Sequence, residues 1–301
     1  MLELKNEKIA VPIVLFAGLI WSFGPLVVRY MDDPNLVPWQ YIFGRGLTIF
    51  ILLNLYLYFE EGIKFYKNYL KMGYSGIIGG TGLGIAMISF IYSITNTSAA
   101  ITLLCLAAMP FFTALLAFLF LKEKISLNVW ISIFIATIGI IIMAFGSTGS
   151  NSLVGFIFGM LSSIGFSIFS VTLRWRTQTP KFTTVAFSGF FCFVFAAIML
   201  LSTKQVFFST SYNGALFSLH GTLVCLGLIL YSIGSKAIPA AELTLLSLTE
   251  VIGGIFWVWL PILGINEVPD TYTIVGGFFL FISLIYYSLL MRWNKRFIAL
   301  N

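Results

Sequence analysis

Long apolar stretches alternate with short polar connections along the whole chain. Each stretch is about as long as the roughly 20 residues that an α-helix needs to cross the hydrocarbon core of a bilayer. The polar connections are too short to fold as separate domains. The pattern therefore predicts an all-α membrane protein with ten transmembrane helices. The expected spans cover residues 9–30, 38–59, 72–93, 97–121, 128–146, 153–173, 183–202, 215–235, 239–263 and 272–292.

The composition agrees with a location in the membrane. Of the 301 residues, 59% are hydrophobic and only 9% are charged, whereas a soluble domain carries about 25% charged residues. The net charge of +6 does not indicate nucleic-acid binding, because the basic residues are spread over short loops and form no continuous stripe. The sequence predicts an integral membrane protein that is surrounded by the lipid bilayer and has no nucleic-acid partner.

The sequence contains no pattern typical of a metal site or a catalytic centre. Cys105, Cys192 and Cys225 lie inside apolar stretches without metal-ligand spacing, and such thiols are typically small buried apolar groups. There is no histidine pair for a metal, no nucleophile turn and no glycine-rich loop after a strand. We therefore expect no metal, no cofactor and no enzymatic activity.

The lysines and arginines between the spans are distributed unevenly. If both termini lie on one side of the membrane, nearly all of these residues fall on that side, while Arg29 and Lys204 fall on the other. Short cytoplasmic loops carry an excess of Lys and Arg. The sequence therefore predicts a multi-pass protein of the cytoplasmic (inner) membrane with both termini in the cytoplasm.

Two apolar stretches that lie almost half a chain apart carry the same short pattern. Residues 21–22 (Trp-Ser) are followed by Arg29, seven positions after the serine. Residues 166–167 (Phe-Ser) are followed by Arg174 at the same distance. A pattern that recurs in two helix-length apolar segments indicates an internal repeat.

A second pair of segments supports the repeat. Residues 98–100 (Ser-Ala-Ala) lead through one expected span to Glu123. Residues 239–241 (Pro-Ala-Ala) lead through another span to Glu267, although this match needs a three-residue insertion. The predicted topology places Glu123 on the cytoplasmic side and Glu267 on the external side.

The number of spans in each half determines how the halves are oriented. With five spans per half, an odd number, the second half enters the membrane from the opposite side. We therefore expect two inverted five-helix repeats, residues 1–148 and residues 149–301. In membrane proteins this architecture is typical of transporters, whose substrate site lies between the repeats.

The chain resembles the EamA-like, ten-helix branch of the drug/metabolite transporter superfamily, and the resemblance covers nearly all of it. The matching positions are Trp21, Ser22, Arg45, Tyr92, residues 98–100, Pro110, residues 121–124 (Leu-Lys-Glu-Lys), Tyr231, residues 240–241, residues 248–250 (Leu-Thr-Glu), residues 257–259 (Trp-Val-Trp) and residues 267–269 (Glu-Val-Pro). The resemblance implies alternating-access transport of small organic metabolites, often export. Val251 stands where the family often has a proline, so the residue that would kink this span is missing.

Glu250 is the sharpest candidate for a functional residue. It is expected near the middle of the span 239–263, where an unpaired ionisable group costs about 2.5–3.5 kcal/mol or more. Its carboxyl group either contacts a substrate amine, carries a coupling proton, or is held by a hydrogen bond from a neighbouring helix. Met109 stands at the corresponding place in the first half, and a substrate site between the repeats would produce such an asymmetry.

Arg45 is expected about six residues inside the span 38–59, where its charge needs a partner or a wet cavity. Its fork of donors suits a substrate carboxylate. Alternatively, the side chain extends to the lipid headgroups or holds a neighbouring helix end. If Arg45 and Glu250 both face the cavity, a zwitterionic substrate would meet two complementary charges.

Several aromatic and polar residues are candidates for the cavity wall. Aromatic residues make up 17% of the chain, so packing is the alternative interpretation for each of them. Ser22 and Asn96 could add orienting hydrogen bonds. His220 is expected at the outer edge of its span, with a proton relay as the alternative. The aromatic candidates are Trp21, Tyr92, Tyr231, Trp257 and Trp259.

These observations favour a secondary transporter that moves a small organic metabolite by alternating access. The combination of aromatic residues, one acid and one base suits an amino acid or a similar amphipathic compound, by export or exchange. Protons are the candidate coupling ion, with Glu250 as their carrier. The alternatives are a non-transporting membrane receptor or assembly factor and, less favoured, an intramembrane enzyme.

The predicted topology can be tested by cysteine-accessibility labelling. A membrane-impermeant thiol reagent added from outside should label cysteines placed in the loops that contain Asn151 and Asn213. It should miss cysteines in the loops that contain Lys67 and Lys181, because the positive-inside distribution places these loops in the cytoplasm. The reverse pattern, or labelling of both sets, would refute the orientation.

Overall fold

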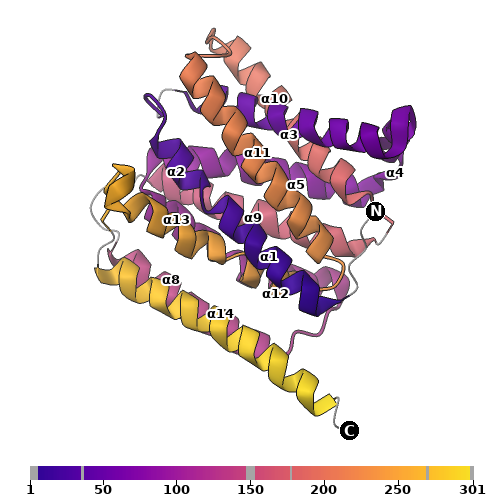
Figure 1. Ribbon diagram of the computed structural model, residues 1–301, viewed down its shortest axis with the longest axis vertical. Coiled ribbons are helices and arrows are strands. Elements are labelled where there is room, and N and C mark those ends of the chain that lie inside the picture. The colour runs from indigo at the N-terminus through magenta and orange to yellow at the C-terminus, as the bar shows by residue number, and fades with distance from the viewer. Residues whose placement is uncertain (1–5, 35–36, 147–152, 177, 269–270, 299–301) are drawn as a thin grey trace.

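The computed structural model describes residues 6–34, 37–146, 153–176, 178–268 and 271–298, and every regular element in these ranges is a helix (Figure 1). In chain order the elements are α1 (Glu7–Trp21), α2 (Gly24–Arg29), α3 (Pro38–Glu61), η1 (Gly62–Tyr66), α4 (Lys67–Lys71), α5 (Gly73–Asn96), α6 (Ala99–Leu106), α7 (Met109–Leu116), η2 (Ala117–Leu121), α8 (Leu127–Gly146), α9 (Leu153–Trp175), α10 (Lys181–Ser202), α11 (Ser211–Gly234), α12 (Ala240–Leu246), α13 (Thr249–Trp259), η3 (Pro261–Leu263) and α14 (Thr271–Ile298).

The helices follow the hydropathy pattern of the sequence closely. Within the described ranges, 8 helical segments are long and apolar enough to cross a membrane. Two shorter apolar stretches, Leu127–Ile142 and Ile274–Tyr287, lie where the remaining spans were expected. The all-helical membrane class is confirmed, and the count of ten spans stays a prediction. Asn151 and the expected boundary between residues 148 and 149 fall outside the described residues.

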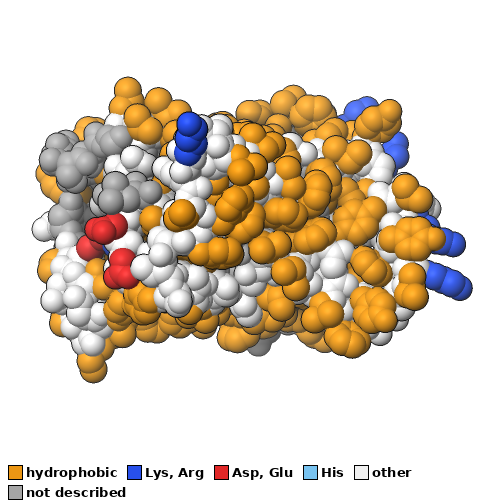
Figure 2. Space-filling model, turned by 90° about the horizontal axis from the view of Figure 1, so that it is seen from above, with side chains coloured by type: hydrophobic (Ala, Val, Ile, Leu, Met, Phe, Trp, Pro, Cys, Tyr) orange, Lys and Arg blue, Asp and Glu red, His pale blue; other side chains and the backbone are white. Residues whose placement is uncertain are grey.

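The surface of the molecule matches a bilayer. Apolar side chains cover most of the middle of the face shown in Figure 2, and most of its Lys and Arg side chains lie at one end. Large apolar side chains such as Phe59, Phe134 and Phe278 are exposed. In water such a surface would be costly, whereas lipid tails are as apolar as these side chains.

Three spans are interrupted near their middle. The first span breaks between α1 and α2, the fourth between α6 and α7, and the ninth between α12 and α13. Pro25 and Pro110 stand in the first turns of α2 and α7. A proline has no amide hydrogen and its ring clashes with the preceding turn, which explains both of these breaks.

The break between α12 and α13 arises without a proline. The Ser247 and Thr249 hydroxyls donate to the carbonyls of Thr244 and Leu246, at 2.8 and 3.2 Å. Such local bonds compete with the regular backbone ladder of the helix. The span is therefore interrupted even though Val251 replaces the proline, because serine and threonine side chains disrupt the helix just before it.

Helices of the first half pack mainly against helices of the second half. The extensive pairs are α3 with α10, α5 with α9, α1 with α11, and α8 with α14, the last pair along one edge (Figure 1). Helices that lie five spans apart are counterparts, so that α1 corresponds to α9, α3 to α10, α5 to α11 and α8 to α14. If each helix is replaced by its counterpart, the same four packing pairs result, and the contact of α3 with α11 becomes that of α10 with α5. The two halves thus share one packing scheme and interdigitate.

Paired glycines allow helices of the two halves to approach closely. At the crossing of α3 and α10, a methyl group on Gly189 would lie 2.8 Å from the Gly46 carbonyl oxygen, and one on Gly46 would lie 3.0 Å from the Gly189 oxygen. At the crossing of α5 and α9, Gly82 and Gly165 face each other in the same way. Small residues at helix crossings are typical of membrane proteins, because they let backbones pack directly.

The α3–α10 crossing yields a stability prediction. Gly189→Ala should destabilise the protein by about 1–3 kcal/mol, the usual cost of overpacking a tight core. Gly277→Ala is the matched control, because a methyl group there meets no atom within 4 Å. Thermal unfolding of the purified proteins in detergent measures both effects. An unchanged midpoint for Gly189→Ala would contradict the packing of this crossing.

Candidate functional site

A cavity of about 70 Å³ lies inside the helix bundle, between residues of both halves. Most of its wall is apolar, and the charged or titratable side chains come from α3, α11 and α13. The lining residues are Trp21, Arg45, Leu83, Ala86, Met87, Phe90, Leu106, Met109, Ser162, Phe166, His220, Val224, Leu228 and Glu250. Trp21, Arg45 and Glu250 were expected to face one site, and the structure brings them together here.

The break in the ninth span places Glu250 at the cavity. It is the second residue of α13, in the first turn, where the helix dipole favours a negative charge. Met109 is the first residue of α7, after the equivalent break, and lines the same cavity. Among the described residues, no hydrogen bond or ion pair reaches the Glu250 carboxylate, so the alternative of a structural hydrogen bond finds no support here.

Arg45 lies in the interior and not at the lipid surface. Arg45 is only 3% exposed, and its Nη2 donates to the Met87 carbonyl of α5 at 2.6 Å. The guanidinium carbon lies 5.9 Å and 6.0 Å from the ring centres of Tyr41 and Phe90. No described carboxylate lies within 4 Å of it, so its remaining donors are available to the cavity.

His220 is also part of the cavity, and its expected place at the membrane edge is wrong. It is 2% exposed, and its Nδ1 shares a hydrogen bond with the Tyr41 hydroxyl. The helix α11 begins at Ser211 because Thr210 caps it by accepting from the Asn213 amide at 3.0 Å. The span therefore starts four residues earlier than expected, which moves His220 inward. The capping threonine is the signal that could have revealed this.

Three aromatic rings close one side of the cavity. Trp21 meets Phe166, its counterpart in the other half, edge to face with 5.6 Å between ring centres. Tyr231 lies behind them, 5.4 Å from Trp21 and 5.2 Å from Phe166. The Tyr231 hydroxyl shares a hydrogen bond of 2.7 Å with Ser170 Oγ. Tyr231 thus supports the wall but does not line it.

The remaining candidates lie outside the cavity lining. Trp257 Nε1 donates to Ser22 Oγ at 2.8 Å, and Trp257 lines a separate apolar groove of about 660 Å³ between α1, α13 and α14. Tyr92 packs between Trp39 and Phe158, with ring centres 4.8 and 5.1 Å away.

The sequence reasoning also missed some of the lining residues. Ser162, Phe166 and Met109 face the cavity, but the sequence did not single them out for it. Their apolar neighbours carry no pattern that distinguishes a cavity face from a packed face. Only the match of Phe166 to Trp21 in the repeat could have indicated its place.

Comparison with known proteins supports this architecture. Residues 8–145 match the model of the EamA-like transporter family. A Helicobacter pylori protein named "Uncharacterized transporter" is 31% identical over 54% of this chain, so the chain matches about half of that relative's length. A Clostridium kluyveri protein of the same name is 26% identical over 72% of both chains.

Two further likenesses cover more of the chain. A Pseudomonas aeruginosa protein named "Pseudopaline exporter CntI" is 24% identical over 76% of this chain and 84% of its own length. A solved crystal structure superposes with a TM-score of 0.69 over 96% of this chain and 100% of its own, at 16% identity. The last likeness shows that the fold is shared.

The hydrogen bond between Tyr41 and His220, which lines the cavity, yields a stability prediction. Tyr41→Phe leaves the buried His220 ring without this partner, which should cost about 1–3 kcal/mol of stability. Tyr74→Phe is the control, because Tyr74 is exposed on α5. Thermal unfolding of both variants compares the two effects. Equal midpoints for the two variants would show that the hydrogen bond does not stabilise the fold.

Proposed function

We propose that the chain belongs to the EamA-like transporter family, whose model matches residues 8–145, and that it is a secondary transporter of a small organic metabolite. The observation that carries this proposal is the pairing of one basic and one acidic side chain in the same cavity. Arg45 and Glu250 come from different halves of the chain and line the same cavity, without an ion pair between them. A charge held in a membrane interior without a partner is costly, and it is typical of a substrate or ion pathway.

The two charges and the wall define a class of substrate. The guanidinium of Arg45 suits a carboxylate, which it can bind through two parallel hydrogen bonds. The Glu250 carboxylate suits an amine, and the aromatic wall of Trp21 and Phe166 suits an apolar side chain. An amino acid or a similar amphipathic zwitterion fits this combination. The other expected site residues act indirectly, with Tyr231 behind the wall and Ser22 and Trp257 bonded to each other beside Trp21.

The mechanism we propose is alternating access across the cytoplasmic membrane, with both termini in the cytoplasm. Inverted repeats would present the cavity first to one side and then to the other, and the shared packing scheme of the two halves supports this. The relative named as a pseudopaline exporter favours export of the substrate. Glu250 would either hold the substrate amine or carry a coupling proton, since one carboxyl group can serve either role.

The charge of Glu250 provides the central test. A thermal-shift screen against metabolites first identifies a ligand, because ligands that bind the folded state raise its stability. Flux of that ligand into proteoliposomes is then measured for wild type, Glu250→Gln and the control Glu60→Gln, which changes an exposed side chain of α3. We expect Glu250→Gln to reduce flux about tenfold or more, because a charge-assisted contact is lost.

The pH dependence of the same flux separates the two roles of Glu250. If Glu250 carries the proton, the variant should transport with a flattened pH profile. If it binds the substrate amine, the variant should lose affinity only for amine-bearing ligands. Wild-type flux from Glu250→Gln at every pH would remove Glu250 from the site. Ligand binding without flux would instead support the receptor alternative.

A further inference from the structure

Two arginines, one in each half, fasten opposite ends of the helix bundle in the same way. At the end of α2, Arg29 Nε donates to Glu267 Oε1 at 2.5 Å. Its terminal nitrogens donate to two backbone carbonyls, those of Ile94 at 3.2 Å and Thr97 at 3.3 Å. These carbonyls belong to the turn between α5 and α6. We call this set of bonds the Arg29 clasp.

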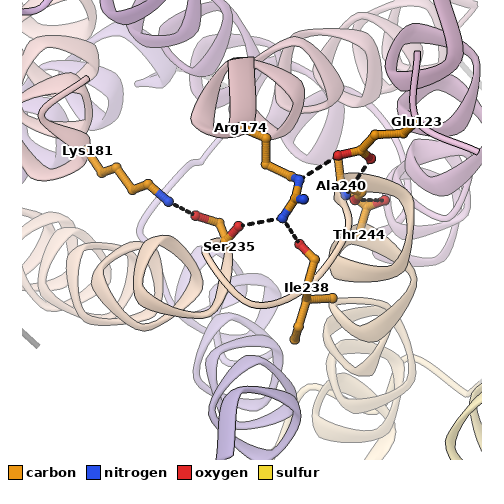
Figure 3. Close-up of polar contacts among 7 residues, drawn as sticks. All are labelled: Glu123, Arg174, Lys181, Ser235, Ile238, Ala240 and Thr244. Carbon is orange, nitrogen blue, oxygen red and sulfur yellow. Dashed lines mark hydrogen bonds and ion pairs between the residues drawn. The ribbon is translucent and has the colours of Figure 1, made fainter. Parts of the chain in front are cut away.

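The second set lies at the end of α9 and is shown in Figure 3. Arg174 Nε donates to Glu123 Oε1 at 2.6 Å. Nη1 of Arg174 donates to the carbonyls of Ser235 at 3.2 Å and Ile238 at 2.8 Å, in the turn between α11 and α12. We call this set the Arg174 clasp.

The two clasps use corresponding residues of the repeat. Arg174 lies 145 positions after Arg29, and Glu267 lies 144 positions after Glu123. The carbonyls follow the same rule, because Ser235 and Ile238 each lie 141 positions after Ile94 and Thr97. The offset of 141 is the one that relates residues 98–100 to residues 239–241. Three polar contacts on each side would not coincide in this way unless the repeat had preserved them for a shared purpose.

Each clasp connects the two halves of the chain. The Arg29 clasp joins α2 and the α5–α6 turn of the first half to Glu267, which follows α13 of the second half. The Arg174 clasp joins α9 and the α11–α12 turn of the second half to Glu123, which follows α7 of the first half. Neither arginine can leave its glutamate without separating the end of one half from the other half.

The cavity lies between the clasps. Trp21 and Phe166 line it, and each stands eight positions before its arginine, which is about 12 Å along a helix. Both clasps are formed at once, and the cavity of about 70 Å³ is far smaller than the roughly 300–1,000 Å³ of a ligand pocket. We therefore expect that the helices must move apart before a metabolite can occupy the cavity.

We propose that the Arg29–Glu267 and Arg174–Glu123 clasps are the two gate locks of the transport cycle, and that each opening breaks one clasp while the other stays closed. This rests on the proposed transport function and adds the residues that control access. With the predicted orientation, the Arg29 clasp closes the external side and the Arg174 clasp closes the cytoplasmic side. Salt bridges suit this role because charge-assisted hydrogen bonds are strong and geometrically specific, so that they re-form in the same arrangement.

The test uses accessibility of the cavity, so that it does not depend on knowing the substrate. Ser162, which lines the cavity, is replaced by cysteine in a full-length chain whose three native cysteines are changed to alanine. A membrane-impermeant maleimide is then added from the outside or the inside of oriented membrane vesicles. The rate of labelling reports how often the cavity opens to each side.

Neutralising one glutamate should open one side only. We expect Glu267→Gln to raise external labelling about tenfold, the shift that loss of one charge-assisted hydrogen bond produces, while internal labelling falls or stays constant. Glu123→Gln should raise internal labelling by a similar factor. Glu60→Gln should change neither rate, because its side chain is exposed and takes part in neither clasp.

Arg29→Lys and Arg174→Lys provide a second pair of variants, in case a glutamine variant does not fold. A lysine keeps the charge but cannot span three acceptors as a guanidinium does, so each should show the same side preference with a smaller increase. The proposal is overturned if either member of a pair raises labelling equally from both sides, or if all four folded variants label at the wild-type rate. Side-specific labelling without flux of any metabolite would leave the locks standing and reject the transport function.

Discussion

The constraint on which this structure depends is that lipid offers no hydrogen bonds. A carbonyl that a broken helix releases inside the membrane must find a donor within the protein. The break between α6 and α7 is satisfied by α9, whose Ser163 and Ser167 donate to the carbonyls of Cys105 and Met109. At the break between α12 and α13, Thr249 donates to the Leu15 carbonyl of α1 at 3.2 Å and so ties this break to a neighbouring helix. Both interrupted helices are thus hydrogen-bonded at their breaks to helices that pack beside them.

The same constraint explains how much of the fold the sequence could predict. The span edges agree within a few residues, because hydropathy and polar connections alone determine them. The break beside Val251 could not be predicted from a proline pattern, because Ser247 and Thr249 produce it through bonds to their own backbone. The start of α11 depended on one capping threonine, and the misplacement of His220 followed from it.

The candidate site was predictable only where charge decided it. Arg45 and Glu250 had to face a cavity or a partner, because their burial in lipid would be too costly. The aromatic residues carried no such constraint, since an aromatic side chain packs equally well against lipid, a helix or a ligand. Trp21 lines the cavity, while Tyr92 and Trp257 pack elsewhere. The neighbouring helices decide which face of an apolar helix points inward. The hydropathy of the sequence does not contain this information.

The two halves share the parts that hold the bundle together and differ in the parts that line the cavity. The arginine clasps recur in both halves, whereas Met109 stands opposite Glu250 in the repeat. Similar arginine clasps would make the two closed ends of the bundle similar in stability, so that neither the external nor the cytoplasmic end would be permanently closed. Asymmetry in the lining gives the bound molecule one orientation and one charge pattern to match.

The two arginine clasps differ in one respect, the helix on which each arginine stands. A break at Ser22 and Phe23 separates Trp21 from Arg29, so Arg29 stands on the short helix α2. Phe166 and Arg174 belong to the continuous helix α9. If the clasps act as the proposed locks, we expect α2 to turn about this break and carry Arg29 alone, so that opening at the Arg29 end is local. Opening at the Arg174 end would instead move the continuous helix α9 as a rigid body.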